Sequence, residues 1–301
     1  MSARARKVRV SCPAKINLNL SIFGLREDGF HDLRSVVVPV GLEDELEINW
    51  DPCAQGPDRL EVNGADCGEQ RQNAVLRALH AFRDLVQLRE GRFEAVLRKH
   101  IPVGAGLGGG SSNAAGTLRA LAQLFPGEVS RESLRETGLS LGSDVPLFFS
   151  GGPVLMEGRG ERLSPVPQDL TRRLLGRPVW LFKPAFAVAT AEAYQRLARV
   201  RLYEAGRPSR DAFWQEWRES GDLLPPGGNR FEDLLAQWLP SIPVLLKRLR
   251  AGGYGATAMS GSGSACFLIA EEDGIADSEL GGQVRDAWGT TAWSAKIHLK
   301  F

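Results

Sequence analysis

The chain has 301 residues, of which 43% are hydrophobic, so it can bury one large core or two moderate ones. Its 37 Lys and Arg residues nearly balance its 36 Asp and Glu residues, which argues against a general nucleic-acid binder. No apolar run reaches the length of a membrane span, and no signal-like apolar segment follows the basic start at residues 1–7. We therefore expect no membrane partner.

The first half is predicted to be rich in strands and then mixed. Apolar residues that alternate or recur at helical spacing predict strands over 8–12, 16–22, 36–40 and 46–50, a helix opened by Asn73, a strand over 92–102, a helix over Asn113–Leu124 and a helix capped by Ser130 that ends at Gly138 or Gly142.

A shift to Pro, Arg and polar residues over 165–178 indicates the passage between two domains, 1–165 and 166–301. Beyond it we expect a strand over 179–182, a helix capped by Thr190, helices from Asn229 and Pro243, and strands over 266–270 and 291–301. Strands and helices without strict alternation indicate an α+β fold.

Cysteine and histidine spacing gives no metal-binding pattern. The four cysteines are scattered without C-x-x-C spacing, and the four histidines form no cluster. We therefore expect reduced thiols in a cytosolic protein and no dedicated metal site.

The segment with the clearest chemistry is a glycine-dense loop from Pro102 to Ala115 that runs into a predicted helix. Glycine lets a backbone approach a ligand closely, and the first N–H groups of a helix attract anions. The loop is therefore predicted to bind phosphate. A flexible linker is the alternative, but a linker needs neither a flanking strand nor an abutting helix.

Two familiar phosphate patterns do not fit this loop. The P-loop pattern starting at Gly104 places Gly110 where its lysine should stand. The dinucleotide pattern matches Gly104, Gly106 and Gly109, but the strand before it alternates and no acidic residue ends a following strand.

Two further segments carry charged side chains whose role the pattern alone leaves open. Lys15 lies among alternating apolar residues, so it either faces a cavity or points from the sheet to water. Asp144 lies between a glycine and an apolar run, where it either borders a cavity or caps a helix or turn.

Two turns complete the set. The segment 24–33 places Phe30 and His31 after an Asp-Gly turn, which suits either a binding tip or a plain hairpin. The segment 259–264 is a Gly/Ser turn, which beside a phosphate loop would form a second backbone clamp.

Taken in order, these five segments resemble the GHMP kinase superfamily of small-molecule kinases. Its phosphate loop has the same P-x-G-x-G-x-G-G-G-S-S-N-A-A string. The R-E-D-G-F-H element further resembles the branch that phosphorylates a hydroxyl on the methylerythritol part of a cytidine diphosphate substrate, on the methylerythritol phosphate route to isoprenoid precursors. The resemblance is tight to about Gly160 and loose over 172–226.

The resemblance implies a two-domain α+β kinase fold with an N-terminal ATP-binding domain and the active site in the cleft between domains. It implies Asp144 as general base with Lys15 close by, and Asn17 in the same pocket. An ammonium keeps a neighbouring carboxylate ionised, and an attacking alcohol must lose its proton.

The resemblance also implies the binding residues. Phe30 and His31 would hold the cytosine, with Tyr194 as a second stacking ring (Phe186 is the rival) and Thr190 touching the substrate. Ser260, Gly261, Ser262 and Gly263 would form the second loop. ATP, with Mg²⁺ on its phosphates and a possible oxygen from Ser111 or Ser112, would be held by Asn73, Lys99, Pro102, Gly104, Gly106, Gly108, Gly109, Gly110, Ser111 and Ser112.

Three positions depart from the family pattern. Phe30 stands where many members have tyrosine, which removes a hydroxyl and keeps stacking. Arg230 follows Asn229 where an aspartate is usual, and the segment 201–227 has no counterpart. Its aromatics Phe213, Trp214 and Trp217 are expected in the core.

Two alternatives stay open. Another GHMP kinase, of the homoserine or mevalonate type, would share the loop without needing Phe30 and His31. A non-catalytic nucleotide sensor is free to lose Lys15 or Asp144, and both are present. The pathway belongs to bacteria and plastids, and the lack of a transit peptide favours a bacterial cytosol.

Overall fold

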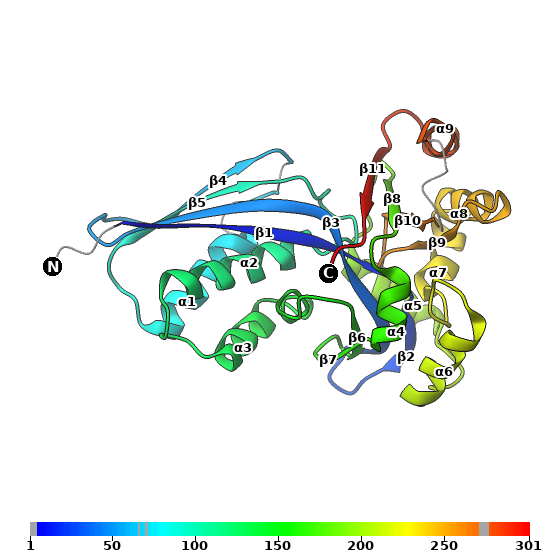
Figure 1. Ribbon diagram of the computed structural model, residues 1–301, viewed down its shortest axis with the longest axis horizontal. Coiled ribbons are helices and arrows are strands. Elements are labelled where there is room, and N and C mark those ends of the chain that lie inside the picture. The colour runs from blue at the N-terminus through cyan, green and yellow to red at the C-terminus, as the bar shows by residue number, and fades with distance from the viewer. Residues whose placement is uncertain (1–4, 66, 70–71, 271–276) are drawn as a thin grey trace. The chain divides into compact units, whose positions relative to one another are not determined.

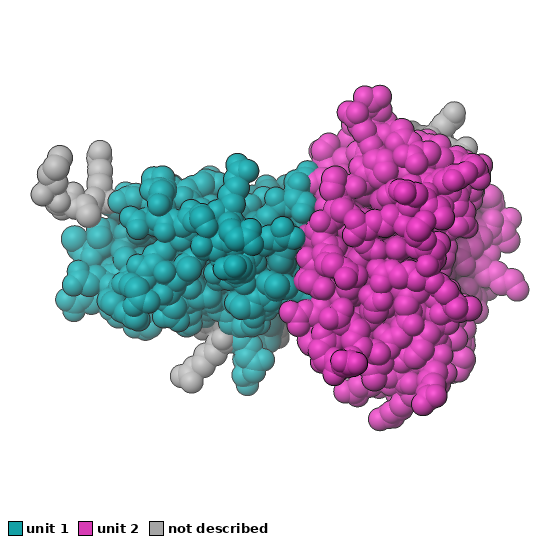
Figure 2. Space-filling view, turned by 90° about the horizontal axis from the view of Figure 1, so that it is seen from below, with its two compact units in different colours: residues 1–14, 42–103, 108–151 teal, residues 15–41, 104–107, 152–301 magenta. Residues whose placement is uncertain are grey.

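The computed structural model describes residues 5–65, 67–69, 72–270 and 277–301. The chain divides into two compact units (Figure 2). Unit 1 comprises residues 1–14, 42–103 and 108–151, and unit 2 comprises residues 15–41, 104–107 and 152–301. Strands β1 (Arg6–Asn17) and β3 (His31–Asp51) each contribute residues to both units.

Unit 1 is a sheet with helices on one of its faces (Figure 1). Strand β5 (Arg92–Arg98) pairs antiparallel with residues 45–51 of β3 and parallel with β4 (Arg59–Asn63). The remaining elements of the unit are α1 (Ala74–Val86), α2 (Gly109–Leu124), α3 (Arg131–Leu141) and the 3₁₀-helix η2 (Pro146–Phe149). Helix α1 packs against both α2 and α3.

Alternation along β3 and β5 explains why these strands form. Leu46, Ile48 and Trp50 are buried on β3, while Glu47 and Asn49 between them are only half-buried. Trp50 packs on Phe93 of β5 with ring centroids 4.5 Å apart. The predicted strands over 46–50 and 92–102 are therefore confirmed, although β5 ends at Arg98.

The helix ends of unit 1 follow their capping residues. Asn73 caps α1 by accepting a hydrogen bond from the Val75 N–H, and Ser130 caps α3 in the same way through Ser133. Both predicted caps are confirmed, and α3 ends at Leu141 with Gly142 as its C-cap. The prediction for α2 was wrong by four residues, because the helix begins at Gly109, inside the glycine run, rather than at Asn113.

Unit 2 contains two groups of paired strands. Residues 33–37 of β3 pair antiparallel with β6 (Val154–Gly158), which pairs with β7 (Arg162–Pro165), and β2 (Ser21–Leu25) also pairs with β3. The second sheet has the order β11-β8-β10-β9. Its strands are β8 (Pro178–Lys183), β9 (Ala256–Met259), β10 (Cys266–Ile269) and β11 (Trp293–His298).

Helices cover the second sheet and build the outer part of unit 2 (Figure 1). They are α4 (Gln168–Leu174), α5 (Thr190–Val200), α6 (Arg210–Ser220), α7 (Arg230–Trp238), α8 (Ser241–Ala251) and α9 (Asp277–Trp288). A buried cluster joins α8 and α9 to the sheet through Leu245, Leu280 and Trp180.

Several sequence predictions in unit 2 need correction. The Pro-rich stretch 165–178 contains helix α4, and α8 begins at Ser241 rather than Pro243. Thr190 is the first residue of α5, whose cap position is Ala189. Phe213 and Trp217 are buried in α6, which confirms two of the expected core aromatics, and Trp214 is half-buried.

The mixture of sheets and helices confirms the α+β prediction. All four cysteines carry free thiols. Within the described part of the chain, none of the helices has the length and apolar character needed to span a membrane.

Candidate active site

The glycine loop belongs to both units: residues 104–107 lie in unit 2, and the residues on either side of them lie in unit 1. In unit 2, two other segments fix the loop backbone. The Lys15 N–H donates to the Leu107 carbonyl at 2.9 Å, and the Ala265 N–H donates to the Ala105 carbonyl at 3.0 Å. The end of β1 and the turn before β10 thus set the path of the loop.

Gly106 is the loop position at which close approach to the turn 260–264 requires glycine. Its φ is +76°, and a Cβ there would lie 2.4 Å from the Ser260 carbonyl oxygen and 3.0 Å from that of Gly263. The Ser260 hydroxyl also donates to the Gly106 carbonyl at 3.0 Å. The Gly/Ser turn 260–264 therefore lies directly against the phosphate loop.

The second part of the loop starts helix α2 in unit 1. Gly108, with φ +73°, is the cap residue, and the first intrahelical bond runs from the Ser112 N–H to the Gly108 carbonyl at 2.9 Å. A Cβ on Gly110 would meet nothing within 4 Å. The N–H groups of this first turn precede the intrahelical bonds and suit an anion.

The hydroxyl of Ser112 has no hydrogen-bond partner among the described residues, although it is buried. A buried hydroxyl without a partner at a helix N-terminus is suited to a ligand oxygen or to a metal ion carried by one. Over the described ranges, no group of three His, Cys, Asp or Glu side chains could hold a metal ion. The donor set therefore fits a metal that arrives with the phosphates.

Lys15 lies at the centre of a buried polar cluster in unit 2. Its side chain is 5% exposed, and its ammonium donates to Asn17 Oδ1 at 2.5 Å and to the Gly106 carbonyl at 2.9 Å. Asn17 Nδ2 donates in turn to the Ser35 hydroxyl at 2.8 Å. The structure thus joins Lys15 and Asn17 to the glycine loop and buries Lys15 rather than leaving it in water.

Asn229 fixes the other side of the Gly/Ser turn. Its amide nitrogen donates to the carbonyls of Met259 at 2.7 Å and Gly261 at 2.9 Å, while its oxygen caps α7 through Phe231. In the same turn, the Ser262 hydroxyl lies 3.0 Å from that of Thr190 at the start of α5. The turn therefore contacts Asn229 before α7 and Thr190 at the start of α5, in addition to the glycine loop and the end of β1.

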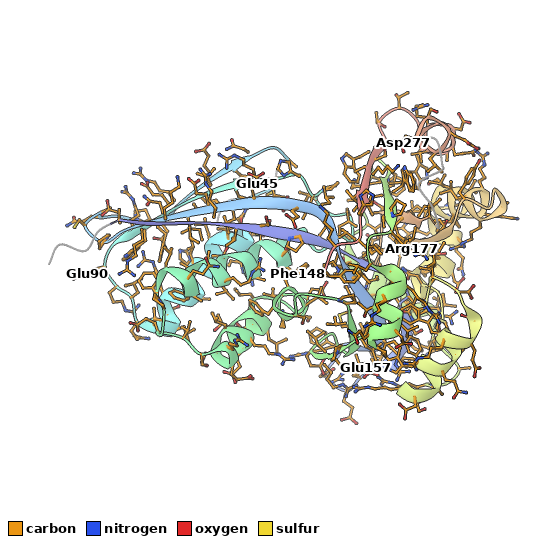
Figure 3. The ribbon with its side chains drawn as sticks, viewed as in Figure 1. Glu45, Glu90, Phe148, Glu157, Arg177 and Asp277 are labelled. Carbon is orange, nitrogen blue, oxygen red and sulfur yellow. The ribbon has the colours of Figure 1, made fainter. Side chains whose placement is uncertain are left out.

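Asp144 lies in unit 1, on the turn between α3 and η2, and is half-buried. The backbone there is held by the Val145 N–H, which donates to the Gly142 carbonyl at 3.1 Å. The neighbouring residues Val145 and Phe148 are buried, and Figure 3 labels Phe148 on η2. The carboxylate is therefore carried by a turn that a buried apolar segment anchors.

His31 begins β3 and has two tyrosines of unit 2 as ring neighbours. Its ring centroid is 5.0 Å from that of Tyr194 and 6.0 Å from that of Tyr203, and Tyr194 packs edge-on against Phe231 at 4.9 Å. His31 is 8% exposed, and its Nε2 has no hydrogen-bond partner among the described residues. Burial lowers the pKa of His31, so the imidazole is neutral near pH 7.

A neutral imidazole with a free ring nitrogen can hydrogen-bond a heterocyclic base, either as donor or as acceptor according to its tautomer. Of the two rival rings for stacking, Tyr194 is the one placed against His31. Phe186 contributes its carbonyl, which accepts a hydrogen bond from the Ser264 hydroxyl at 2.8 Å.

Phe30 lies at the tip of the hairpin and is 46% exposed. The Asp28 carboxylate accepts from the Phe30 N–H at 3.2 Å, and the Arg159 guanidinium lies 5.1 Å from the Phe30 ring centroid. An exposed, oriented aromatic ring is suited to stacking on a base.

The two residues expected near the adenosine have structural partners in unit 1. Asn73 caps α1. The buried ammonium of Lys99 makes an ion pair with Asp44 and donates to Asn113 Oδ1 at 3.1 Å. Asp44 also accepts from the N–H groups of His100 and Ile101, so it connects the strand before the loop to helix α2.

Sequence reasoning missed Asp44, Ser35 and Tyr203. Asp44 follows no motif, but a buried lysine such as Lys99 requires a carboxylate, and that requirement is a usable signal. Ser35 and Tyr203 meet their partners only through the tertiary fold.

With this geometry in place, comparisons with known proteins become informative. The N-terminal domain model of the GHMP kinases matches residues 73–152, and the C-terminal model of the same family matches residues 210–292. The 4-diphosphocytidyl-2-C-methyl-D-erythritol kinase of Deinococcus radiodurans is 38% identical over 95% of this chain and 92% of its own length. The chain belongs to the 4-diphosphocytidyl-2-C-methyl-D-erythritol kinase family. Membership makes it an ATP-dependent phosphotransferase.

Solved structures agree with this assignment. A crystal structure of 4-(cytidine 5'-diphospho)-2C-methyl-D-erythritol kinase matches with a TM-score of 0.75 and 33% identity, covering 97% of this chain and 99% of the other. A homoserine kinase from Cytophaga hutchinsonii matches with a TM-score of 0.66 at 16% identity, covering 98% of this chain and 96% of its own. The second match shows a shared fold alone.

Proposed function

We propose that this chain transfers the γ-phosphoryl group of ATP to the 2-hydroxyl of 4-diphosphocytidyl-2-C-methyl-D-erythritol. The observation that carries the substrate choice is the buried His31, which has an unpartnered Nε2 and two tyrosine rings as neighbours. A homoserine or mevalonate kinase has no base to recognise and needs no such pocket. The family assignment points to the same substrate.

In this proposal Asp144 is the general base. Its carboxylate takes the proton of the substrate hydroxyl as the oxygen attacks the γ-phosphorus, and the bond from that phosphorus to the bridging oxygen of ADP breaks. Lys15 would orient the hydroxyl, and Asn17 fixes the ammonium through its 2.5 Å contact. A positioned base contributes about 10²–10⁴ in rate, so binding and orientation of the phosphates must supply much of the remainder.

The phosphates of ATP would lie on the glycine loop, from Gly104 through Gly106 to Gly108–Gly110, against the N-terminus of α2. The turn Ser260–Gly263 would form a second loop of the phosphate site, and Pro102, Asn73 and Lys99 would lie near the nucleoside. Mg²⁺ would arrive on the phosphates and neutralise their charge, and the hydroxyls of Ser111 or Ser112 are suited to complete its oxygen shell. The orphaned Ser112 hydroxyl supports this placement.

The cytosine would stack between Phe30 and Tyr194, with His31 reading its edge and Thr190 at the substrate end of α5. The substitution of tyrosine by Phe30 leaves stacking available. The exposed ring of Phe30 and the ring of Tyr194 against His31 support this arrangement.

We keep the division into an ATP-binding domain of residues 1–165 and a second domain of 166–301. The boundary falls between the two family matches, which end at residue 152 and resume at residue 210. We also place the reaction in the bacterial cytosol, which the four free thiols and the bacterial relative support.

The test is ADP release by the purified protein with Mg²⁺, offered 4-diphosphocytidyl-2-C-methyl-D-erythritol, mevalonate or homoserine in parallel. We expect turnover with the cytidine compound alone. Turnover with another alcohol would contradict the assignment of Phe30, His31 and Tyr194 to a base pocket. ATP binding without turnover on any of the three would favour a sensor.

A further inference from the structure

The segment 201–210, here called the strap, runs from the end of α5 to the first residue of α6 and carries Tyr203. Tyr203 is half-buried, and its ring centroid lies 6.0 Å from that of His31 with 50° between the ring planes. The imidazole therefore has aromatic neighbours from two separate segments, α5 and the strap.

The first anchor of the strap is the residue after Tyr203. The Glu204 N–H donates to the Ile22 carbonyl of β2 at 2.7 Å, and its carboxylate pairs with Arg230 at 2.5 Å. Arg230 also pairs with Asp233 at 2.9 Å, on its own helix. The arginine that departs from the family pattern is thus the residue that ties the strap to α7.

The second anchor is Glu157 on β6, which Figure 3 labels. Its side chain is 3% exposed and receives three arginines: Arg34 from β3 at 3.0 Å, Arg207 from the strap at 2.8 Å and Arg210 from the end of the strap at 2.6 Å. Arg207 also pairs with Asp32 at 2.6 Å, one residue after His31. Such multiple charge-assisted bonds hold a segment far more firmly than one surface pair does.

We propose that Tyr203 is a positioning residue for His31, and that the strap, through Glu204–Arg230 and the arginines on Glu157, fixes the imidazole for recognition of the pyrimidine. This inference rests on the proposed function, because it assigns specificity to the same pocket. It also gives a role to a segment for which the family pattern has no counterpart.

The role follows from the geometry of the imidazole. His31 has an unpartnered Nε2, so no hydrogen bond at that atom holds the ring before the base arrives. Contact with the rings of Tyr194 and Tyr203 limits rotation of the imidazole and so keeps Nε2 in one direction. Removing the Tyr203 ring lets the imidazole rotate. Affinity for the base then falls, because binding must order the imidazole again at a cost in entropy.

The experiment measures binding of cytidine 5'-diphosphate by calorimetry, without ATP, to the wild type, Tyr203→Ala and Tyr203→Phe. We expect Tyr203→Ala to weaken binding roughly 3- to 10-fold, the range of an aromatic pair, while Tyr203→Phe stays near the wild type. With the full substrate, KM for the cytidine compound should rise by the same factor, and kcat and KM for ATP should hold.

Tyr254→Ala is the matched control. Tyr254 is also half-buried, but it packs against the cluster between α8, α9 and the second sheet. It should lose stability without changing cytidine 5'-diphosphate affinity. If Tyr203→Ala does not fold, Tyr203→Leu and Glu204→Gln replace it, and both should weaken the same nucleotide in the same direction.

The outcomes separate the two proposals. Equal affinity of the wild type and the Tyr203 variants for cytidine 5'-diphosphate would overturn the role of Tyr203 and leave the proposed function standing. A parallel loss of ATP affinity would mark Tyr203 as merely structural. A wild type that binds ATP but not cytidine 5'-diphosphate would overturn the proposed function and this inference with it.

Discussion

The glycine loop and the His31 pocket are built by different means. The loop is one contiguous run of backbone, fixed by carbonyl contacts at Ala105, Gly106 and Leu107. The pocket is assembled from side chains of β3, α5 and the strap, which lie far apart in the sequence. The proposed phosphate site is therefore formed by residues close together in the sequence, whereas the proposed base site depends on tertiary packing.

This difference predicts that variants in one region leave ligand binding at the other intact. Asp144 belongs to neither region, so Asp144→Asn shows the effect of a variant outside both binding regions. We expect kcat to fall about 10²–10⁴-fold, because the amide cannot take the hydroxyl proton, with ATP affinity nearly unchanged. Steady-state kinetics and ATP calorimetry measure both. Normal turnover would remove Asp144 from the role of base.

Glu157→Gln tests the support of the base pocket. Burial alone would raise the pKa of Glu157, but hydrogen bonds from Arg207, Arg210 and Arg34 lower it to about 2 from 4.5. A lowered carboxyl pKa gives stability that is present above pH 4.5 and is lost as pH falls toward 2. The shift corresponds to roughly 3 kcal/mol.

We therefore expect the variant to unfold at lower urea concentration at pH 7 and to show a flatter pH dependence between 4.5 and 2. Cytidine 5'-diphosphate affinity should fall more than ATP affinity. An unchanged acid profile would show that the arginines do not stabilise the native state through this carboxylate.

His31→Ala tests most directly whether the two regions bind their ligands independently. Loss of a hydrogen bond to a buried base costs about 1–3 kcal/mol, so affinity for the cytidine substrate should fall roughly 5- to 150-fold. ATP affinity should change little. The same calorimetric titrations with both ligands give the comparison, and equal weakening of the two would contradict the assignment of His31 to the base.

Gly106→Ala perturbs the loop alone. Its Cβ would meet the Ser260 carbonyl oxygen at 2.4 Å in a left-handed backbone conformation, which costs about 1–3 kcal/mol. ATP affinity should fall, and cytidine 5'-diphosphate affinity should stay. Gly282→Ala in α9 is the control, since a Cβ there would meet nothing within 4 Å and its φ is not in the left-handed region. If both variants bound ATP equally, the Gly/Ser turn would have no part in shaping the loop.

The same division, between local contacts and tertiary packing, separates the features that the sequence predicts from those that it does not. Alternation correctly predicted the strands around Leu46 and Phe93, and side-chain caps correctly predicted the helix starts after Asn73 and Ser130, because each signal lies within a few residues. Helix α2 was placed late because glycines disfavour helices, although Gly108 in a left-handed conformation begins this one.

Long-range pairs were beyond such reasoning. Helix α4 lies in a stretch whose Pro and Arg content resembles a linker, and long-range packing of its buried Leu170 and Leu174 stabilises it. The partners of Lys99 and Arg230, Asp44 and Glu204, stand 55 and 26 positions away in the chain. No spacing rule joins them.

The measurement that tests the central claim most directly is the position of the transferred phosphoryl group. The wild type would be incubated with Mg²⁺, ATP and 4-diphosphocytidyl-2-C-methyl-D-erythritol, and the product followed by ³¹P and ¹³C NMR. The account predicts one new phosphomonoester coupled to the carbon that bears the 2-hydroxyl, with the diphosphate bridge intact. A phosphoryl group on another hydroxyl, or ATP hydrolysis with the substrate unchanged, would contradict it.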